Sequence, residues 1–226
     1  FLSNRVVLVS RACSINKTLP SKVCVIHNGI NVNAGDAIKH GIGNDISIGY
    51  LGRIHPTKGV DWLIGLISYL SKEGLEVSLK IKGEFEPDTT PYHKELLHLV
   101  DTLSLTEKVS FEGFIDNPDE IYRDVDIVFV PSITPDPLPR AVMESMARGL
   151  VVFAFNSGGV IEMINHKVNG YVISQDYEES LGLLRELIER QDLYNEVSIA
   201  AYQHAKKNLS ISNLYLNINT LYSKDL

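Results

Sequence analysis

Short apolar runs rich in β-branched residues alternate along the chain with longer stretches whose apolar residues recur every three or four positions. The short runs predict β-strands. Residues 127–130 and 151–155 are apolar throughout, as expected of strands that are covered by helices on both faces. Strands are predicted at 5–10, 22–27, 46–51, 77–82, 109–112, 127–131, 151–155 and 171–173.

The stretches between these runs predict amphipathic helices. Residues 60–71 carry apolar residues at the i, i+3, i+4 and i+7 positions, and Gly74 is placed to end that helix. Further helices are predicted at 92–103, 140–148, 177–190, 193–208 and 212–223. Strands that alternate with helices of this length predict an α/β fold with a doubly wound parallel sheet.

Ligands of such sheets bind where the strands end and loops lead into helices. Five loops directly follow a predicted strand, at 52–59, 83–91, 113–118, 132–140 and 156–160. Candidate functional residues are therefore expected in these loops.

Length, composition and net charge exclude several classes of protein. The chain has 226 residues, of which 44% are hydrophobic and 22% charged, so it can bury the core of one large or two small domains and is not disordered. No stretch reaches the roughly 18 uncharged apolar residues that a membrane span requires. A net charge of −7 argues against a protein that grips nucleic acid, but allows a small anionic ligand held by one or two cations.

The first residues lack both an initiator Met and the layout of a signal peptide, which is expected of a piece of a longer chain. Cys13 and Cys24 are the only cysteines, and both are predicted to be buried, unpaired thiols. The seven histidines show no metal-ligand spacing, so no zinc site is expected.

The loop at 52–59, with the sequence GRIHPTKG, is the first candidate site. Arg53 and Lys58 flank a turn that opens a helix. An arginine fork, a compact lysine charge and the free N–H groups of a helix start together suit a diphosphate. The alternative is that both cations are solvated side chains on a turn.

The segment at 131–144 holds two carboxylates that are eight residues apart, Asp136 in the loop and Glu144 in the helix. Ionised carboxylates accept hydrogen bonds from vicinal hydroxyls, as in a ribose or a hexose. The alternative is that Asp136 caps the helix and Glu144 is a solvated surface residue.

A Gly-Gly turn at 158–159 follows the strand at 151–155. It allows the backbone to approach a ligand closely, or merely lets the chain turn. A dinucleotide-binding GxGxxG is absent, because Ile46 stands where the third glycine after Gly41 and Gly43 belongs.

Six segments, in order, carry a resemblance to one known family. They are KVCVIHNGIN (22–31), GRIHPTKGVDWLI (52–64), KIKGE (80–84), VSFEGFI (109–115), DIVFVPSITPDPLPRAVMESMARG (126–149) and NSGGVIEMI with VNGYVI (156–173). Over nearly its whole length, the chain resembles the retaining glycosyltransferases of the glycosyl-group-1 type (sequence family 4).

The resemblance implies the GT-B architecture, in which two Rossmann-like domains face a cleft. This chain resembles the C-terminal half of that fold. The implied division is residues 1–33 as closing strands of a mostly missing N-terminal domain, 34–45 as a linker, 46–208 as the nucleotide-sugar-binding Rossmann-like domain, and 209–226 as a C-terminal helix.

The resemblance also implies roles for the candidate residues. Arg53 and Lys58 match the pair that contacts the donor diphosphate. Glu144 matches the second carboxylate of the family's E-x7-E motif, which usually holds the ribose. Asp136 stands where the first glutamate is common, facing the transferred sugar, but it is one methylene shorter.

Two further groups complete the implied binding site. The backbone of Leu138, Pro139 and Arg140 would approach the phosphates, although Pro139 replaces a common glycine and so removes one N–H donor. Phe114 and Ile115 match the loop beside the nucleobase.

The implied function is that of the donor-binding domain of a retaining glycosyltransferase, which moves a sugar from a nucleotide-diphosphate sugar to an acceptor hydroxyl. The nucleotide sugar is a substrate, so no cofactor is expected. No metal is expected either, because Arg53, Lys58 and the helix start supply the positive charge. The alternatives are a non-catalytic nucleotide-sugar-binding module and a sugar-nucleotide epimerase.

The expected partners of the complete protein are a nucleotide-diphosphate sugar and an acceptor glycan or lipid carrier, the latter held by the missing N-terminal domain. Nucleic acid and a transmembrane segment are not expected. The expected location is cytoplasmic, with peripheral association at the inner face of the membrane as a variant. This chain alone is expected to bind donor and to transfer nothing.

Overall fold

The computed structural model describes residues 5–14, 22–32, 41–86 and 89–224. Most of the predicted linker, residues 34–40, lies outside the described residues. The strands are β1 (Val6–Leu8), β2 (Val23–Val25), β3 (Asp45–Leu51), β4 (Glu76–Lys82), β5 (Val109–Gly113), β6 (Ile127–Val130), β7 (Val151–Phe155) and β8 (Tyr171–Ile173).

The helices follow the predicted strand-helix alternation. They are α1 (Val60–Lys72), α2 (Thr90–Thr102), α3 (Pro118–Tyr122), α4 (Arg140–Met146), α5 (Val160–Met163), α6 (Tyr177–Glu189), α7 (Gln191–Asn208) and α8 (Ile211–Lys224). The described residues include two 3₁₀ turns, η1 (Arg11–Cys13) and η2 (Pro56–Lys58), of which η2 lies within the candidate loop at 52–59.

Six parallel strands form the central sheet in the order β5-β4-β3-β6-β7-β8. The chain runs outward from β3 to β5 in one direction and from β6 to β8 in the other, which confirms the predicted doubly wound sheet. The order reverses between β3 and β6. In such sheets this reversal opens a crevice at the carboxyl ends of the two strands.

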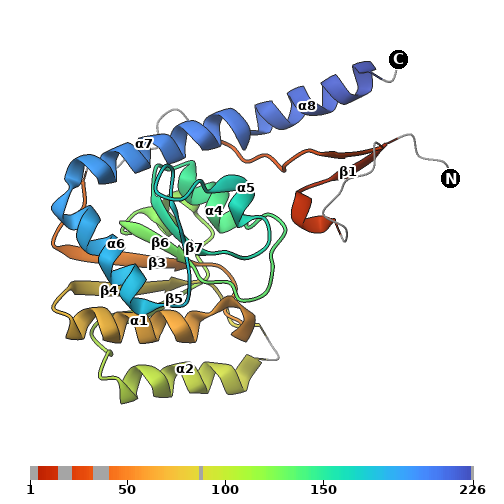
Figure 1. Ribbon diagram of the computed structural model, residues 1–226. Coiled ribbons are helices and arrows are strands. Elements are labelled where there is room, and N and C mark those ends of the chain that lie inside the picture. The colour runs from red at the N-terminus through yellow and green to blue at the C-terminus, as the bar shows by residue number, and fades with distance from the viewer. Residues whose placement is uncertain (1–4, 15–21, 33–40, 87–88, 225–226) are drawn as a thin grey trace.

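The two faces of the sheet belong to two hydrophobic clusters. In β6 and β7, Phe129 and Phe153 pack into the cluster that contains α1, α2 and α6. Val128 and Val152 pack into the other cluster, which contains α4, α5 and part of α7. Figure 1 shows α1 and α2 on one side of the sheet and α4, α5 and α7 on the other. The uninterrupted apolar runs of these strands therefore reflect helices on both faces.

The N-terminal segment forms its own small parallel sheet, in which β1 pairs with β2. It is tied to the rest of the chain at the junction of α7 and α8. There the Ile30 N–H donates to the Leu209 carbonyl at 2.9 Å, and the Ile211 N–H donates to the Ile30 carbonyl at 2.9 Å. Helix α8 continues beyond α7 on the side of the molecule that carries β1 (Figure 1).

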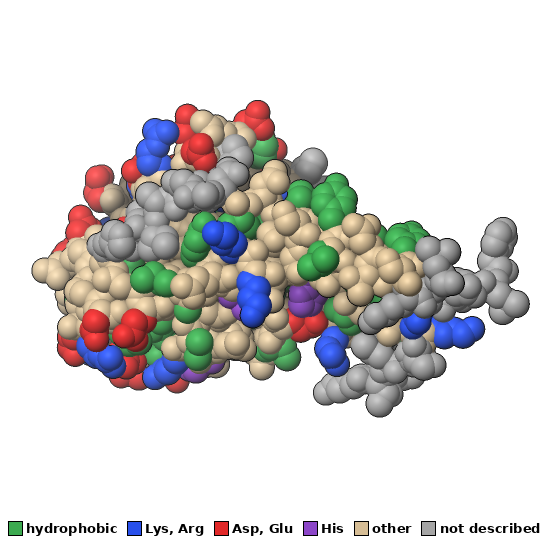
Figure 2. Space-filling view, turned by 90° about the horizontal axis from the view of Figure 1, so that it is seen from above, with side chains coloured by type: hydrophobic (Ala, Val, Ile, Leu, Met, Phe, Trp, Pro, Cys, Tyr) green, Lys and Arg blue, Asp and Glu red, His purple; other side chains and the backbone are tan. Residues whose placement is uncertain are grey.

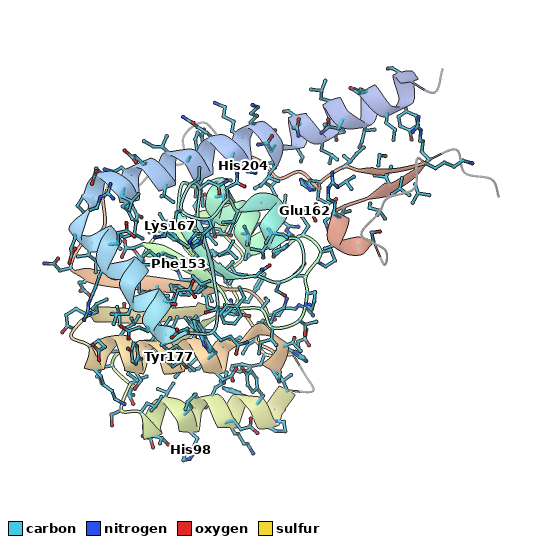
Figure 3. The ribbon with its side chains drawn as sticks, viewed as in Figure 1. His98, Phe153, Glu162, Lys167, Tyr177 and His204 are labelled. Carbon is cyan, nitrogen blue, oxygen red and sulfur yellow. The ribbon has the colours of Figure 1, made fainter. Side chains whose placement is uncertain are left out.

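Glu162 of α5 makes a second tie to this segment. Its carboxylate accepts the N–H groups of Arg11 and Ala12 at 3.0 and 3.2 Å, and it lies 3.2 Å from Nε2 of His27. Figure 3 shows Glu162 at the side of α5 that faces η1. Since α5 begins at the Gly-Gly turn, the placement of the N-terminal segment is coupled to that turn.

Three expectations need correction. Helices α3 and α5 were not predicted, because they are too short for an apolar period to develop. The helix expected at 140–148 ends at Met146. Both cysteines are free, as expected, but Cys13 is exposed and Cys24 is half-buried, so their predicted burial is wrong.

Viewed onto α7 and α8, hydrophobic and charged side chains are interspersed, with acidic groups mainly toward the end opposite β1 (Figure 2). Within the described ranges, no helix is long and apolar enough to cross a membrane.

Candidate functional site

Two adjoining cavities of about 370 Å³ each lie at the carboxyl ends of the strands. The central cavity, at the reversal between β3 and β6, is lined by Lys58, Asp136, Leu138 and Pro139 among others. The lateral cavity, toward β5, is lined among others by Phe114, Ile115 and Glu144. Arg53 and Arg140 line both cavities. The structure thus brings together all the residues that were singled out as binding or catalytic candidates.

Arg53 reaches out from the loop after β3. Its side chain is 72% exposed, and Nη1 donates to the carboxylate of Glu86. Its backbone is held by Tyr50, whose hydroxyl donates to the Arg53 carbonyl at 2.5 Å. Burial raises the pKa of Tyr50 well above its ordinary value, so that hydroxyl stays a donor. The base of Arg53 is therefore fixed while its guanidinium is movable.

Lys58 ends the η2 turn, which His55 caps by accepting the Thr57 N–H on Nδ1 at 3.2 Å. The next residue, Gly59, has φ of 69°, and a Cβ there would lie 2.2 Å from the Pro131 carbonyl oxygen. Only glycine allows this approach. The Lys58 loop therefore packs closely against the residue that follows β6. In this position the Nζ of Lys58 lies 3.4 Å from Oδ2 of Asp136.

Asp136 makes two side-chain contacts, one through each carboxylate oxygen. Its Oδ1 accepts the Leu138 N–H at 3.2 Å and closes a turn before α4. Its Oδ2 faces Lys58 across the central cavity. The N-cap of α4 is Pro139, whose side chain makes no cap, so Asp136 stabilises the turn that leads into the helix and not the helix end itself.

The Gly-Gly turn brings protein backbone close to protein backbone. The Gly159 N–H donates to the Asp136 carbonyl at 2.9 Å, and a Cβ at Gly159 would lie 1.8 Å from the Pro137 carbonyl oxygen. The close approach that the turn allows is thus made to the loop of Asp136. The turn therefore packs against the loop that carries Asp136 and supports it.

Glu144 projects from the second turn of α4, and both of its carboxylate oxygens are occupied. Oε2 accepts the Tyr122 hydroxyl at 2.9 Å. Oε1 accepts two guanidinium N–H groups of Arg140, at 2.6 and 3.1 Å. The hydrogen bonds to Glu144, followed by the negative charge of Glu144, raise the pKa of Arg140 above its ordinary value. Glu144 is therefore a held carboxylate, which differs from the solvated surface residue considered above.

Phe114 and Ile115 follow β5 at the rim of the lateral cavity. Phe114 is 66% exposed and Ile115 is half-buried. The floor beside them contains Lys82, whose side chain is buried. Its Nζ donates to the carbonyls of Glu120 and Ile121 at 3.2 and 2.8 Å and lies 3.6 Å from a carboxylate oxygen of Glu112. This lysine anchors the C-terminal end of α3 to the sheet.

Tyr50, Glu86 and Tyr122 contact the candidate residues and were missed in the sequence. Tyr50 lies within a predicted strand, where a tyrosine is ordinary. Tyr122 lies 22 residues before its partner Glu144, with no periodic signal around it. A local signal existed only for the start of its helix, where Asn117 precedes Pro118 and caps α3.

One Asp-x-Asp spacing occurs, at 124–126, but it lies before β6, at the edge of the sheet opposite the cavities. A carboxylate oxygen of Asp126 accepts the Ser47 N–H at 2.8 Å, and Asp124 lies 4.0 Å from Lys80. Among the described residues, no group of three or more His, Cys, Asp or Glu side chains could hold a metal ion.

The sequence model of the family "Glycosyl transferases group 1" matches residues 36–204. An uncharacterized glycosyltransferase of Methanocaldococcus jannaschii is 30% identical over 188 residues, which cover 74% of this chain and 46% of the relative. A second, from Haemophilus influenzae, is 33% identical over 150 residues, which cover 66% of this chain and 41% of the relative. The chain spans about half the length of the curated relatives it matches.

Two solved structures extend the comparison. HepE of Anabaena in complex with UDP superposes with a TM-score of 0.85 at 23% identity, covering 98% of this chain and 64% of that one. The C-terminal domain of the group 1 protein LpcC of Francisella tularensis gives a TM-score of 0.66 at 28% identity, covering 75% of this chain and 89% of that one.

Proposed function

This chain belongs to the glycosyl transferases group 1 family, and we propose that it is the donor-binding half of a retaining glycosyltransferase that uses a nucleotide-diphosphate sugar. The predicted α/β fold, the C-terminal half of a GT-B architecture, is confirmed by its likeness to the HepE structure. That neighbour was crystallised with UDP and, separately, with UDP-glucose, which supports a nucleotide sugar as the ligand of this fold.

The observation that carries the proposal is the pairing of cations and carboxylates around the two cavities. Arg53 contacts Glu86, and Lys58 contacts Asp136, so each of these two cations of the central cavity already faces a carboxylate. A diphosphate in the central cavity would take the place of these carboxylates. Such pairing of arginine and lysine with anionic oxygens is the chemistry by which proteins hold phosphates.

Arg53 and Lys58 would also serve the reaction. When the anomeric C–O bond of the donor breaks, negative charge grows on the departing diphosphate. Fixed positive groups next to that oxygen stabilise the charge in the transition state. The bond to the acceptor oxygen would form on the face that the leaving group vacates, and the acceptor hydroxyl would give its proton to the departing diphosphate, so no protein nucleophile is required. Because Arg53 and Lys58 would supply the positive charge, no metal is required either.

The remaining candidates complete the donor site. Glu144 would accept the hydroxyls of the ribose, and Asp136 would face the transferred sugar. The lateral cavity would hold the nucleobase beside Phe114 and Ile115. The backbone of residues 138–140 would approach the phosphates from the wall of the central cavity.

We infer that the acceptor, a glycan or a lipid carrier, is held by a part of the complete protein outside this chain, because the chain covers about half of its relatives. On this basis the chain alone binds the donor and transfers nothing. A cytoplasmic location, with the inner face of the membrane as a variant, stays a prediction.

A thermal-shift panel tests the proposal. The probes are UDP, GDP, UDP-glucose and GDP-mannose, each with the matching nucleoside monophosphate as control and with EDTA present. We expect at least one diphosphate to raise the melting temperature more than its monophosphate does, because a ligand that binds the folded state stabilises it. If no diphosphate raises the melting temperature at millimolar concentration, the proposal fails.

A further inference from the structure

The two carboxylate oxygens of Glu144 are held by partners of very different mobility. Oε2 is bound by the hydroxyl of Tyr122, a residue that is only 6% exposed. Oε1 is bound by the guanidinium of Arg140, whose side chain is 80% exposed and sits one helical turn away. The exposed pair within one helix contributes little, typically about 0.3–0.5 kcal/mol. The two contacts therefore respond differently to a ligand.

Two contacts hold Tyr122 in place. It is the last residue of α3, and the buried ammonium of Lys82 binds the carbonyls of the two preceding residues. The guanidinium of Arg148 lies over the tyrosine ring, 4.2 Å from its centroid. The same arginine donates to the Glu144 carbonyl at 3.2 Å, which ties the ring to the backbone of the carboxylate it serves.

The hydroxyl of Tyr122 is a permanent donor. Burial, followed by the negative charge of Glu144, raises the pKa of Tyr122 far above its ordinary value. A hydrogen bond from a neutral hydroxyl to an ionised carboxylate is roughly twice as strong as one between neutral groups. Since Tyr122 is buried and Arg140 is not, a ligand in the lateral cavity displaces the arginine and leaves the tyrosine in place.

We propose that Tyr122 is a positioning residue, which holds Oε2 of Glu144 so that Oε1, released by Arg140, accepts the vicinal hydroxyls of the donor ribose. This inference rests on the proposed function, because it assigns the ribose to Glu144. It adds a division of labour between the two oxygens. Oε2 keeps the carboxylate in place, and Oε1 accepts hydrogen bonds from the ligand.

The geometry supports this division in one further respect. Oε1 has two lone pairs, which is the number that a pair of neighbouring hydroxyls would use. Glu144, Tyr122 and Arg140 all line the lateral cavity, so the carboxylate of Glu144 belongs to the wall of the space that a ribose would occupy. A tyrosine that served only the hydrophobic core would not need a carboxylate at the cavity wall as its partner.

The test compares ribose recognition with general binding. Calorimetry would measure the Kd of UDP and of GDP, each beside its 2′,3′-dideoxy analogue, for the wild-type chain and for Tyr122→Phe. We expect Tyr122→Phe to weaken binding of the ribonucleotide about five- to ten-fold, which is within the range for one ordinary hydrogen bond, because Tyr122 acts through Glu144 and not on the ligand itself. Binding of the dideoxy analogue should change less than about two-fold, because it lacks the hydroxyls that Glu144 would accept.

The matched control is Tyr194→Phe. Tyr194 is also fully buried, and its hydroxyl donates to a carbonyl, that of Asp126, at 2.9 Å. It lies away from both cavities, so its removal should leave both affinities unchanged. The ratio of the two affinities, measured on one sample, does not depend on how stable that sample is.

Each outcome decides the matter. If Tyr122→Phe weakens the ribonucleotide and its dideoxy analogue equally, or weakens neither, Tyr122 does not position Glu144 and the inference is wrong, while the proposed function stands. If the wild-type chain does not distinguish the two nucleotides, the ribose role of Glu144 is wrong as well. If the wild-type chain binds neither, the proposed function itself fails.

Discussion

Each cation of the candidate site is already paired with an acid, and this shapes how the site responds to a ligand. Arg53 is engaged by Glu86, and Lys58 faces Asp136 at 3.4 Å. Both pairs are partly exposed, so each is worth at most about 1 kcal/mol. A diphosphate with two or more negative charges can therefore displace both carboxylates from their cations. Because it must do so, the two acids weaken its binding.

Glu86 competes with the ligand for Arg53. Replacing it, in Glu86→Gln, removes a negative charge beside the arginine, and we expect a nucleoside diphosphate to bind about two- to five-fold tighter. Calorimetry with UDP and GDP measures this. Glu107→Gln, at an exposed glutamate before β5, is the matched control and should leave the affinity unchanged. Weaker binding in Glu86→Gln would mean that Glu86 contributes to the ligand site.

Asp136 can be tested without disturbing its turn. Asp136→Asn keeps an Oδ1 that accepts the Leu138 N–H and removes the charge that faces Lys58. Binding of UDP or GDP should stay unchanged or tighten by up to about five-fold, because Lys58 loses a competing carboxylate, while UDP-glucose or GDP-mannose should bind about ten-fold more weakly, because the sugar loses a charged acceptor. In the complete enzyme the loss should be larger in kcat.

The opposite pattern would reassign Asp136. If Asp136→Asn leaves both the nucleotide-sugar affinity and turnover unchanged, the charge of Asp136 does not contact the sugar and its side chain serves the turn alone.

His204 makes stability depend on pH. Burial, with His27 close by, lowers the pKa of this histidine below its ordinary value near 6.5. Below about pH 6.5 the unfolded chain takes up a proton that the folded chain refuses, so the free energy of unfolding falls as the pH falls toward the lowered pKa. Melting temperatures at about pH 7.5 and about pH 5.5 should therefore differ less in His204→Gln than in the wild type.

His98→Gln is the control for this measurement, since His98 is exposed on the outer side of α2 (Figure 3). It should keep the pH dependence of the wild type. Equal pH dependence in His204→Gln and the wild type would show that His204 is not the group responsible.

Among the elements, the Gly-Gly turn before α5 supports the loop of Asp136 most directly. A Cβ at Gly159 would lie 1.8 Å from the Pro137 carbonyl oxygen, and backbone at that distance must move. We expect Gly159→Ala to lower the free energy of unfolding by about 1–3 kcal/mol, as for an overpacked site. It should also weaken diphosphate binding, because the displaced segment carries Asp136.

Gly182→Ala provides the matched control. A Cβ at this glycine, in α6, would meet no atom within 4 Å, so alanine should stabilise the helix by up to about 1 kcal/mol. Thermal melts with and without UDP compare the two variants. If Gly159→Ala melted and bound like the wild type, the loop of Asp136 would not depend on this turn.

The elements also show where sequence reasoning succeeds. The apolar runs of β6 and β7 predicted strands buried on both faces, because helices on both sides of a parallel sheet remove both faces from water. Short helices such as α3 complete too few turns to show a period, so their positions came only from the structure. Arg53 and Lys58 were recognisable because they share one loop.

Contacts between distant segments were not predictable from local pattern. The pairing of Arg53 with Glu86 and of Tyr122 with Glu144 depends on which strands lie next to each other in the sheet. The sequence indicated that a carboxylate at 144 could serve a ligand. It carried no sign that a buried tyrosine holds one of its oxygens.

For the molecule as a whole, the charge distribution fits a small anionic ligand. The chain carries a net charge of −7, yet Arg53, Lys58 and Arg140 meet at the cavities at the carboxyl end of the sheet. Local cations can attract a diphosphate where the net charge does not. The ties of Glu162 to η1 and of Ile30 to the α7–α8 junction hold the N-terminal segment beside this site.

The most direct measurement is calorimetric titration of UDP and GDP into the wild-type chain and into Arg53→Ala and Lys58→Ala, once with EDTA and once with Mg²⁺. Lys94→Ala, at an exposed lysine of α2, is the control. We predict metal-independent binding that each site variant weakens by about 1.5–3 kcal/mol, roughly ten- to hundred-fold in Kd, and that the control leaves unchanged. Wild-type affinity in both site variants, or binding only in the presence of a divalent metal, would contradict the account.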